Sequence, residues 1–298
     1  MGSLRDIRRR IGSVESTQKI TSAMKMVSAA KLRRSEEAIS AARPYAERMR
    51  ATLEEVARSG AEATHPLLER REEKRALELV VVTSDRGLAG AFNSNVIKAA
   101  EGVLRARQAE FTKVHLSALG KKGADFFRRR RSGQLGLAQP IGAQVGYARA
   151  QEAARRLMDR FLAGEVDEVV MIYSEFVSKL TQRPRVVTLL PCTPAAVAAA
   201  PGGKSTAEDA PEHLPYEIEP SAAKLLGVLV PKAVEVEVFR ALLENQAGEH
   251  AARMAAMESA TRNTEELIDK LTLEYNRARQ AAITKELVEI VTGAQALE

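Results

Sequence analysis

The sequence predicts a mixed α+β / α/β protein, in which a long antiparallel coiled coil of N- and C-terminal helices accompanies a central Rossmann-like α/β domain. Three observations support this fold class. The first 58 residues hold no glycine after Gly12 and a single proline, Pro44. The middle of the chain alternates short β-branched runs with amphipathic segments. The last third carries apolar and small residues at alternating spacings of four and three, the pattern of a helix-pairing seam.

Residues 1–58 are expected to form the N-terminal helix of the coiled coil. Its seam residues recur every three or four positions. They are Leu4, Ile7, Ile11, Val14, Gln18 and Thr21. Further along, apolar side chains move to neighbouring positions, so the seam is expected to shift to Ile20, Met24 and Val27.

Residues 75–193 are expected to form the central α/β domain. Runs of buried-strand length predict four strands, at Leu77–Thr83, Val114–Ala118, Val166–Tyr173 and Arg185–Leu190. Amphipathic or helix-favouring segments predict helices at about Phe92–Arg107, Gly120–Arg131 and Tyr147–Leu162. Strands that alternate with helices favour right-handed crossovers and a mainly parallel sheet. The segment Gln134–Gly146, punctuated by glycine and proline, is expected to be a connection.

Residues 194–220 are expected to be a mobile linker, because they hold five prolines and the pair Gly202-Gly203. Within this linker, Ala198–Ser205 fits a relaxed phosphate-loop pattern. A phosphate loop requires a strand before it and a helix directly after it, and this segment is followed by an acidic stretch broken by Pro211. We therefore interpret it as a flexible loop.

Residues 221–298 are expected to form the C-terminal helix of the coiled coil. Pro231 is expected to break a short first helix and to begin the next one. The seam then includes Leu243, Ala247, His250, Met254, Met257, Thr261, Thr264, Ile268, Leu271, Tyr275, Ala278 and Ala282. A self-sufficient coiled coil would carry more Leu and Ile at these positions. Part of the two end helices is therefore expected to be held by something outside this chain.

The composition limits the chemistry that this chain can perform. Its single cysteine, Cys192, rules out an intramolecular disulfide and shares no metal-ligand spacing with the four histidines. No apolar run reaches the ~20 residues that a membrane-spanning helix needs. No catalytic triad, metal cluster or carboxylate dyad can be assembled. The sequence therefore predicts no catalytic site, no metal and no cofactor.

One alternative is a nucleotide-binding α/β protein. Thr83–Gly90 follows a predicted strand and precedes a predicted helix, which is where α/β sheets bind ligands. It has only Gly87 and Gly90, and so lacks the full dinucleotide pattern. The competing interpretation is a tight turn in which Asp85 and Arg86 bond locally.

The other alternative is a basic coiled-coil scaffold for nucleic acid. The formal net charge is +6, and basic residues follow the whole N-terminal helix. A solvated face and contact with an acidic surface are the competing interpretations. The run Arg128–Arg131 has no aromatic residues interleaved for base stacking, and is better explained as a cationic helix end.

Three stretches carry a resemblance to a known family: Ile7–Arg34 (IRRRIGSVESTQKITSAMKMVSAAKLRR), Val82–Asn93 (VTSDRGLAGAFN) and Glu244–Ala294, especially its part Asn276–Gly293 (NRARQAAITKELVEIVTG). They resemble the gamma subunits of F-type ATP synthases. The resemblance implies a central rotor shaft that couples ion flow to ATP synthesis or hydrolysis, with no catalysis of its own. With a lone Cys192, redox switching through a cysteine pair is not expected.

The resemblance also implies partners: a ring of alpha and beta subunits, an epsilon subunit and a ring of c subunits, with no nucleic acid and no transmembrane segment in this chain. It implies a peripheral position on the cytoplasmic face of a bacterial inner membrane. A bacterial source is also expected because residues 1–3 before Leu4 do not resemble a transit peptide. The residues expected to contact the alpha and beta ring are Met24, Arg253, Gln280 and Thr284, followed by Lys19, Lys25, Arg279, Glu286 and Glu289.

Overall fold

The computed structural model describes residues 4–58, 65–71, 73–192 and 221–295. The predicted linker 194–220, with its phosphate-loop-like segment, therefore lies outside the described residues. The chain divides into two compact units. One comprises Met1–Ala30 and Arg253–Glu298, and the other comprises Lys31–Ala252. The helices α1 (Leu4–Arg58) and α6 (Ala222–Gln295) each contribute to both units.

The unit Lys31–Ala252 is built on a five-stranded sheet with the order β3-β2-β1-β4-β5. The strands are β1 (Ala76–Val82), β2 (Lys113–Leu119), β3 (Leu135–Gln139), β4 (Glu168–Phe176) and β5 (Gln182–Leu190). The first four run parallel, and β5 is antiparallel to β4. The predicted mainly parallel sheet is thus confirmed.

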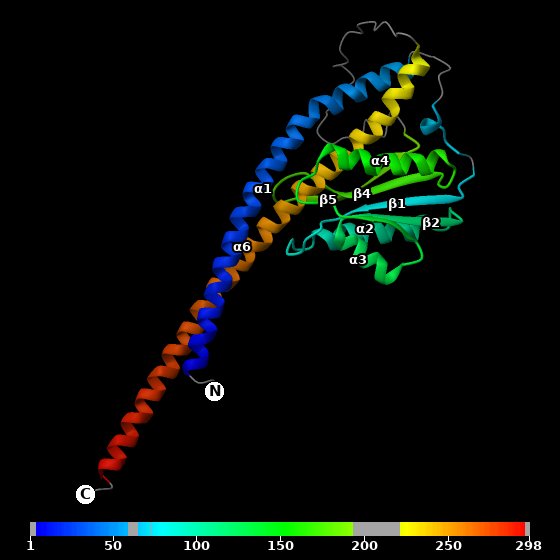
Figure 1. The fold of residues 1–298 in the computed structure, drawn as a ribbon. Coiled ribbons are helices and arrows are strands. Elements are labelled where there is room, and N and C mark those ends of the chain that lie inside the picture. Colours follow the sequence, from blue (N-terminus) through cyan, green and yellow to red (C-terminus); the bar gives the residue numbers. More distant parts are fainter. Residues whose placement is uncertain (1–3, 59–64, 72, 193–220, 296–298) are drawn as a thin grey trace. The chain divides into compact units, whose positions relative to one another are not determined.

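Helices cover both faces of this sheet (Figure 1). On one face lie α2 (Phe92–Arg107) and α3 (Lys121–Arg130), and on the other lies α4 (Tyr147–Leu162). The two faces of β1 alternate between two hydrophobic cores, because successive strand side chains point to opposite faces. Leu77, Leu79 and Val81 pack with α2, whereas Val80 and Val82 pack in the core that includes α4 and the first part of α6.

One strand was not predicted. The segment Gln134–Gly146 contains β3, which pairs only with β2 and shifts register between Leu116 and Ala118. Its residues alternate between half-buried and exposed, and it includes Gly136. An edge strand buries too little apolar surface to show a clear sequence signal, so the expected connection was wrong in this part.

Helix α6 continues through Pro231, so the predicted break at this residue is wrong. Proline removes one backbone hydrogen bond and crowds the carbonyl four residues earlier. That residue is Gly227, whose backbone is the least restricted. Val230 and Val234 are 0% and 1% exposed on either side of the proline. Burial of this apolar face stabilises the helix enough to offset the missing hydrogen bond.

The unit of Met1–Ala30 and Arg253–Glu298 is an antiparallel helix pair, as predicted. Cross-helix contacts join Lys25 to Glu258, Thr21 to Thr261 and Gln18 to Glu265. The residue numbers fall on α1 as they rise on α6, which is the antiparallel register. The α6 seam of this unit is also confirmed, because Met257 and Leu271 are buried and its other predicted members, from Met254 to Ala282, are half-buried.

The predicted seam shift on α1 is wrong. Ile20 and Val27 are 60% and 55% exposed, whereas Thr21 and Ser28 are 9% and 3% exposed. The seam therefore keeps its original register and changes from large apolar residues to small hydroxyl residues. Small residues permit close approach of two helices, and their hydroxyls bond within the helix, as Ser28 Oγ does with the carbonyl of Met24 at 2.8 Å.

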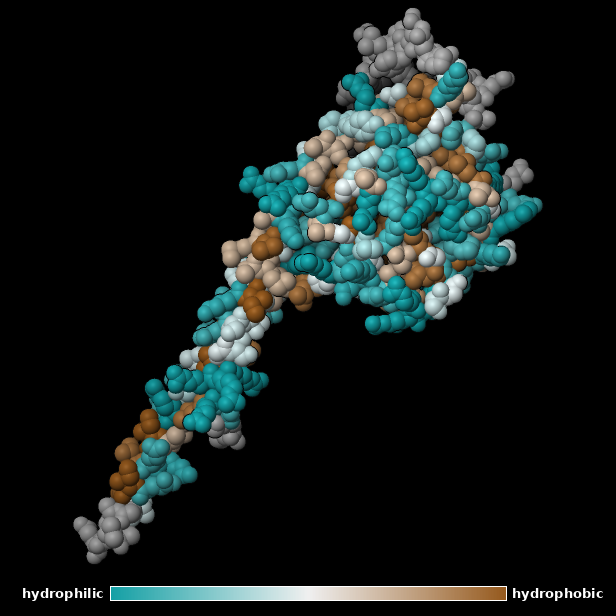
Figure 2. Space-filling model, in the orientation of Figure 1, coloured by the Kyte–Doolittle hydropathy of each residue, from teal (hydrophilic) through white to brown (hydrophobic). Residues whose placement is uncertain are grey.

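The last described turns of α6 carry an exposed apolar surface (Figure 2). Its large members are between 49% and 67% exposed: Ile283, Leu287, Val288, Ile290 and Val291. Nothing among the described residues covers them. No helix in the described part of the chain is apolar over a long enough stretch to cross a bilayer.

Candidate functional site

The carboxyl edge of the sheet is the first place to look for a site. In open α/β sheets, ligands bind beyond the carboxyl ends of the strands. The site lies where the connections from two neighbouring strands lead to opposite sides of the sheet. Here that switch point lies between β1 and β4, which are adjacent and parallel. Helix α6 occupies it through Asn245, which is fully buried at 0% exposure.

Asn245 bonds to the ends of both strands. Its side-chain oxygen accepts the backbone N–H of Ser174 in β4 at 3.3 Å. Its side-chain nitrogen donates to the backbone carbonyl of Thr83, directly after β1, at 3.4 Å. The N–H of Ser174 and the carbonyl of Thr83 are both buried. Without Asn245 they would lose these hydrogen bonds, and an unpaired polar group in a dry interior costs free energy.

Gly248, one turn further along α6, brings the helix backbone close to the same edge. A Cβ built at this position would lie 3.1 Å from a ring carbon of Phe92 and 3.5 Å from Ser174 Oγ. A larger residue would therefore require Phe92 to move. We call Asn245 and Gly248, with their contacts to Thr83, Phe92 and Ser174, the helix–sheet joint.

The turn Thr83–Gly90 is held by its own neighbours. Asp85 accepts backbone N–H groups from Lys121, Ile141 and Gly142 at 2.9, 3.2 and 2.8 Å. The hydroxyl of Ser84 donates to the carbonyl of Arg86 at 2.6 Å. The polar groups of this turn thus organise the first turn of α3 and the loop before α4. Together with α6 in the crevice, this arrangement favours the interpretation as a structural turn.

A charged cluster lies beside the joint. Arg240 pairs with Glu237 at 2.7 Å and approaches Tyr173 Oη at 3.5 Å, while Glu175 of β4 pairs with Arg185 of β5 at 2.7 Å. Burial raises the pKa of Glu244 to about 7, against the opposing attraction of Arg240. Among the described residues, neither Glu244 Oε2 nor Arg240 Nε has a hydrogen-bond partner. Glu244 is therefore a buried carboxyl group that titrates near neutral pH.

A second polar contact joins α6 to α4. Glu235 accepts hydrogen bonds from Tyr147 Oη at 2.5 Å and from Gln151 Nε2 at 3.1 Å, and pairs with Lys232 at 3.3 Å. Burial alone would raise the pKa of Glu235, but the hydrogen bonds from Tyr147 and Gln151 outweigh it and lower the pKa. This carboxylate stays ionised and holds α6 against α4.

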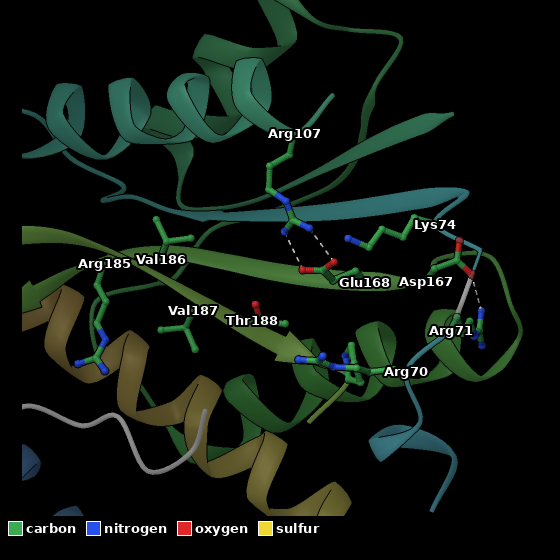
Figure 3. Close-up of a pocket in the computed structure, with 11 residues that line it drawn as sticks. Arg70, Arg71, Lys74, Arg107, Asp167, Glu168, Arg185, Val186, Val187 and Thr188 are labelled. Carbon is green, nitrogen blue, oxygen red and sulfur yellow. Dashed lines mark hydrogen bonds and ion pairs between the residues drawn. The ribbon is translucent and has the colours of Figure 1, made fainter. Parts of the chain in front are cut away.

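A pocket of about 540 Å³ lies at the opposite, amino-terminal edge of the parallel strands (Figure 3). Its lining includes five basic and two acidic side chains: Arg70, Arg71, Lys74, Arg107, Arg185, Asp167 and Glu168. Binding of a phosphate or similar anion requires cations that are not already neutralised.

Most cations of this pocket are already paired. Arg107 donates to both carboxylate oxygens of Glu168, at 2.7 and 2.8 Å, and this bond raises the pKa of Arg107. Arg71 bonds to Asp167 at 3.0 Å. Lys74 and Arg185 pair with Glu110 and Glu175, which do not line the pocket, at 3.4 and 2.7 Å. The geometry therefore favours a structural cluster over an anion site. No group of side chains in the described residues has a metal-binding arrangement.

Comparisons with known proteins give matches over essentially the whole length of this chain. A family model described as ATP synthase matches residues 3–297. An ATP synthase gamma chain from Desulforamulus reducens is 49% identical over 299 residues, and one from Anaeromyxobacter dehalogenans is 50% identical over 301 residues. Each match covers 100% of this chain and 100% of the relative.

The chain belongs to the ATP synthase gamma chain family. Solved structures agree at the level of the fold. The central stalk and c-ring structure of the Tetrahymena thermophila mitochondrial ATP synthase contains a chain with a TM-score of 0.58 at 23% identity, covering 81% of this chain and 99% of that one. A rotor structure of the Euglena gracilis mitochondrial ATP synthase gives a TM-score of 0.62 at 19% identity, covering 94% and 98%.

The partner-contact residues expected for a gamma chain fall into two groups. The first lies around the paired part of the coiled coil. Met24 and Lys25 are half-buried, and Lys25 forms a 3.2 Å ion pair with Glu258. Arg253 is only 8% exposed, whereas Lys19 is exposed. The structure thus places Lys25 in a contact within the chain and leaves Lys19 open to a partner.

The second group lies toward the end of α6, where its members are all exposed: Arg279, Gln280, Thr284, Glu286 and Glu289. Thr284 Oγ1 donates to the carbonyl of Gln280 at 2.9 Å, one turn earlier. Glu289 pairs with Lys285 at 3.5 Å on the same helix. These residues share the segment that carries the exposed apolar surface.

Sequence reasoning missed the helix–sheet joint. Asn245 lies between Glu244 and Gln246 in the sequence, and nothing in its spacing marks it as a bridge between two strands. Gly248 carried the only sequence signal of the helix–sheet joint. Between Gly227 and Gly293 it is the single glycine of α6, and an isolated glycine inside a helix indicates close approach of another segment.

Proposed function

We propose that this chain is the central rotor shaft of a proton-translocating F-type ATP synthase. In this role it couples ion flow through a membrane ring to ATP synthesis or hydrolysis in a ring of alpha and beta subunits. The observation that carries the proposal is the full-length match to ATP synthase gamma chains at 49% and 50% identity.

The geometry supports a mechanical role. Helix α6 runs for 74 residues without interruption and belongs both to the unit with the sheet and to the coiled coil. A continuous helix transmits displacement along its length, because each turn is hydrogen-bonded to the next. One charge crossing 100 mV makes available about 2.3 kcal/mol, so several such steps must be passed through the shaft for one synthesis event.

The outer surface of the coiled coil supports the proposed partners. Ile20, Met26 and Val27 of α1 are between 55% and 65% exposed, and the end of α6 is apolar and exposed as well. Exposed apolar surface of this kind marks contact with another protein. A surrounding ring of alpha and beta subunits would cover both regions and contact Met24, Arg253, Gln280 and Thr284.

Further parts of the proposal concern the rest of the complex. Epsilon and c subunits would bind the unit that contains the sheet. Catalysis would belong to the surrounding ring, and this chain would contribute none. The chain would lie on the cytoplasmic face of a bacterial inner membrane, attached only through its partners.

The two alternatives have less support. A nucleotide-binding role requires an open crevice at the carboxyl edge of the sheet, where α6 packs through Asn245. A nucleic-acid scaffold requires unpaired cations, and one cation of the N-terminal helix, Lys25, is already paired with Glu258.

The test is purification of the tagged chain from its native membranes, with identification of the co-purifying subunits and an ATPase assay. Recovery of alpha, beta, epsilon and c subunits with ATPase activity is the expected result. Recovery of the chain alone, or with nucleic acid, would contradict the proposal. An identically tagged chain with residues 283–298 deleted tests whether the exposed apolar end takes part in assembly.

A further inference from the structure

The contacts between α6 and the sheet differ in the movements that they resist. Apolar packing resists separation of two surfaces, but its driving force is non-directional and depends on buried area rather than on one particular register. A buried hydrogen bond is directional, and breaking it leaves polar groups without partners in a dry environment. Asn245 makes two such bonds, to β4 and to the residue after β1, and has no exposed surface.

Gly248 complements this arrangement. Its missing side chain lets the backbone of α6 lie against Phe92 and Ser174. Rotation of α6 about its own axis would replace Gly248 at this contact with neighbouring residues that have side chains. The close contact at Gly248 therefore opposes rotation of α6 about its own axis, while the two hydrogen bonds of Asn245 oppose movement of α6 along the strand ends.

We propose that the helix–sheet joint of Asn245 and Gly248 is the element through which torque passes between the α/β domain and the shaft helix α6. This inference rests on the proposed rotor function and names the residues that perform it. Asn245 acts as a positioning residue: it contacts no substrate, and holds α6 in fixed register with the strand ends. The contact between Glu235 and α4 supports the same helix ten residues earlier, through longer side chains.

The first experiment is Asn245→Ala in the assembled complex, reconstituted in sealed vesicles. It measures ATP hydrolysis and ATP-driven proton uptake on the same preparation. Each buried polar group that loses its hydrogen-bond partner shifts the equilibrium between the closed and the locally opened joint by on the order of tenfold. We expect ATP hydrolysis to persist, and protons pumped per ATP hydrolysed to fall by about twofold or more. A purely structural role would lower assembly and both rates together.

The matched control is Gln246→Ala. Gln246 is the next residue on α6 and also donates a hydrogen bond to a backbone carbonyl, that of Ala143 at 3.3 Å, but this bond is exposed and the residue only half-buried. This variant is expected to pump protons with the wild-type ratio. An equal loss in Gln246→Ala and Asn245→Ala would overturn the assignment of the joint to Asn245.

The second experiment replaces the hydrogen bonds with a covalent bond. Because a Cβ at position 248 would lie 3.5 Å from Ser174 Oγ, the pair Ser174→Cys and Gly248→Cys brings two thiols close enough for a disulfide. With Asn245 retained, the oxidised and reduced forms of this double variant are expected to show the same turnover and coupling, since the joint stays closed throughout rotation. Any cost of the cysteine beside Phe92 is common to both forms. Combined with Asn245→Ala, oxidation is expected to restore the pumping ratio, and reduction to abolish it again.

Two results would overturn the inference while leaving the rotor function intact. One is a wild-type pumping ratio in an assembled Asn245→Ala complex. The other is loss of turnover on oxidation of the cysteine pair in the chain that retains Asn245, which would mean that α6 moves against the sheet during the cycle. Failure of the proposed function itself would be distinguishable, because the wild-type chain would then not co-purify with an ATPase.

Discussion

Thr261 of α6 donates a hydrogen bond to Thr21 of α1 across the coiled coil, with 2.9 Å between the two hydroxyl oxygens. Two threonines facing each other leave little room, so the helices are close at this point. We expect Thr261→Leu to overpack the seam and to lower the free energy of unfolding by about 1–3 kcal/mol. The smaller change Thr261→Val should cost less than about 1 kcal/mol, because Thr21 keeps the carbonyl of Gln18 as a partner.

Thermal melting followed by circular dichroism measures these differences. Thr272→Leu is the control, since Thr272 lies on the exposed face of the same helix. If Thr261→Leu melts like the Thr272→Leu variant, the helices are not closely packed at Thr21.

The buried carboxyl group of Glu244 predicts a pH-dependent stability. Burial raises its pKa to about 7, above the ordinary value of 4.5. Between these two values the folded chain binds the proton more tightly than the unfolded chain, so this group lowers stability as pH rises. The groups around it are Arg240 and Glu237 on α6, Glu175 on β4 and Arg185 on β5.

Glu244→Gln removes this titration. We expect the variant to be more stable than the wild type at pH 8 by on the order of 2 kcal/mol, and the difference to disappear below about pH 4.5. Urea unfolding at several pH values measures this, with exposed Glu266→Gln as the control. A difference that is constant with pH would show that Glu244 does not titrate in this range.

Gly120 is required by its backbone conformation. It follows β2 with φ of +109°, and a Cβ at this position would lie 2.2 Å from the carbonyl oxygen of Thr83. We expect Gly120→Ala to destabilise the chain by about 3 kcal/mol or more, because strain and steric overlap add. Gly133→Ala, where a Cβ meets nothing within 4 Å, is the matched control. Equal unfolding midpoints in urea for the two variants would contradict this account.

Arg160 neutralises a carboxylate inside the sheet. Glu78 of β1 is 0% exposed and bonds to Arg160 of α4 and to Ser117 of β2. Arg160→Met would leave a buried charge, and we expect a loss of about 3–5 kcal/mol of unfolding free energy. Adding Glu78→Gln should restore part of it. The exposed pair of Arg156 and Glu152 serves for comparison, since Arg156→Met there should cost less than about 1 kcal/mol. Additive losses in the double variant would rule out coupling of Glu78 to Arg160.

Met24→Lys tests the proposed contact with the catalytic ring. Met24 is half-buried on α1. A lysine there would replace an apolar side chain of the proposed contact with a charge, so we expect reduced proton pumping per ATP hydrolysed in the assembled complex. Met24→Leu is the comparison, since it keeps an apolar side chain of similar size at the same position. Normal coupling and turnover in an assembled Met24→Lys complex would exclude Met24 from the contact.

The periodic parts of this fold could be predicted from the sequence. The α6 seam from Met254 to Ala282 follows from residue spacing, because a helix repeats its faces every 3.6 residues regardless of what it contacts. The strand β1 follows from a β-branched run. The residues of the helix–sheet joint could not be predicted, because Asn245 acquires its role only when Thr83 and Ser174 come together.

The sequence by itself determined the two end helices, the mainly parallel sheet and, through its motifs, the family. Only the tertiary structure decided that α1 buries Thr21 and Ser28 while leaving Ile20 and Val27 exposed, and that α6 fills the crevice between β1 and β4. The physical reason is that local patterns specify which faces can be buried. Which of them is buried depends on close approach between segments far apart in the chain, where a small hydroxyl or a missing side chain is favoured over a larger apolar residue.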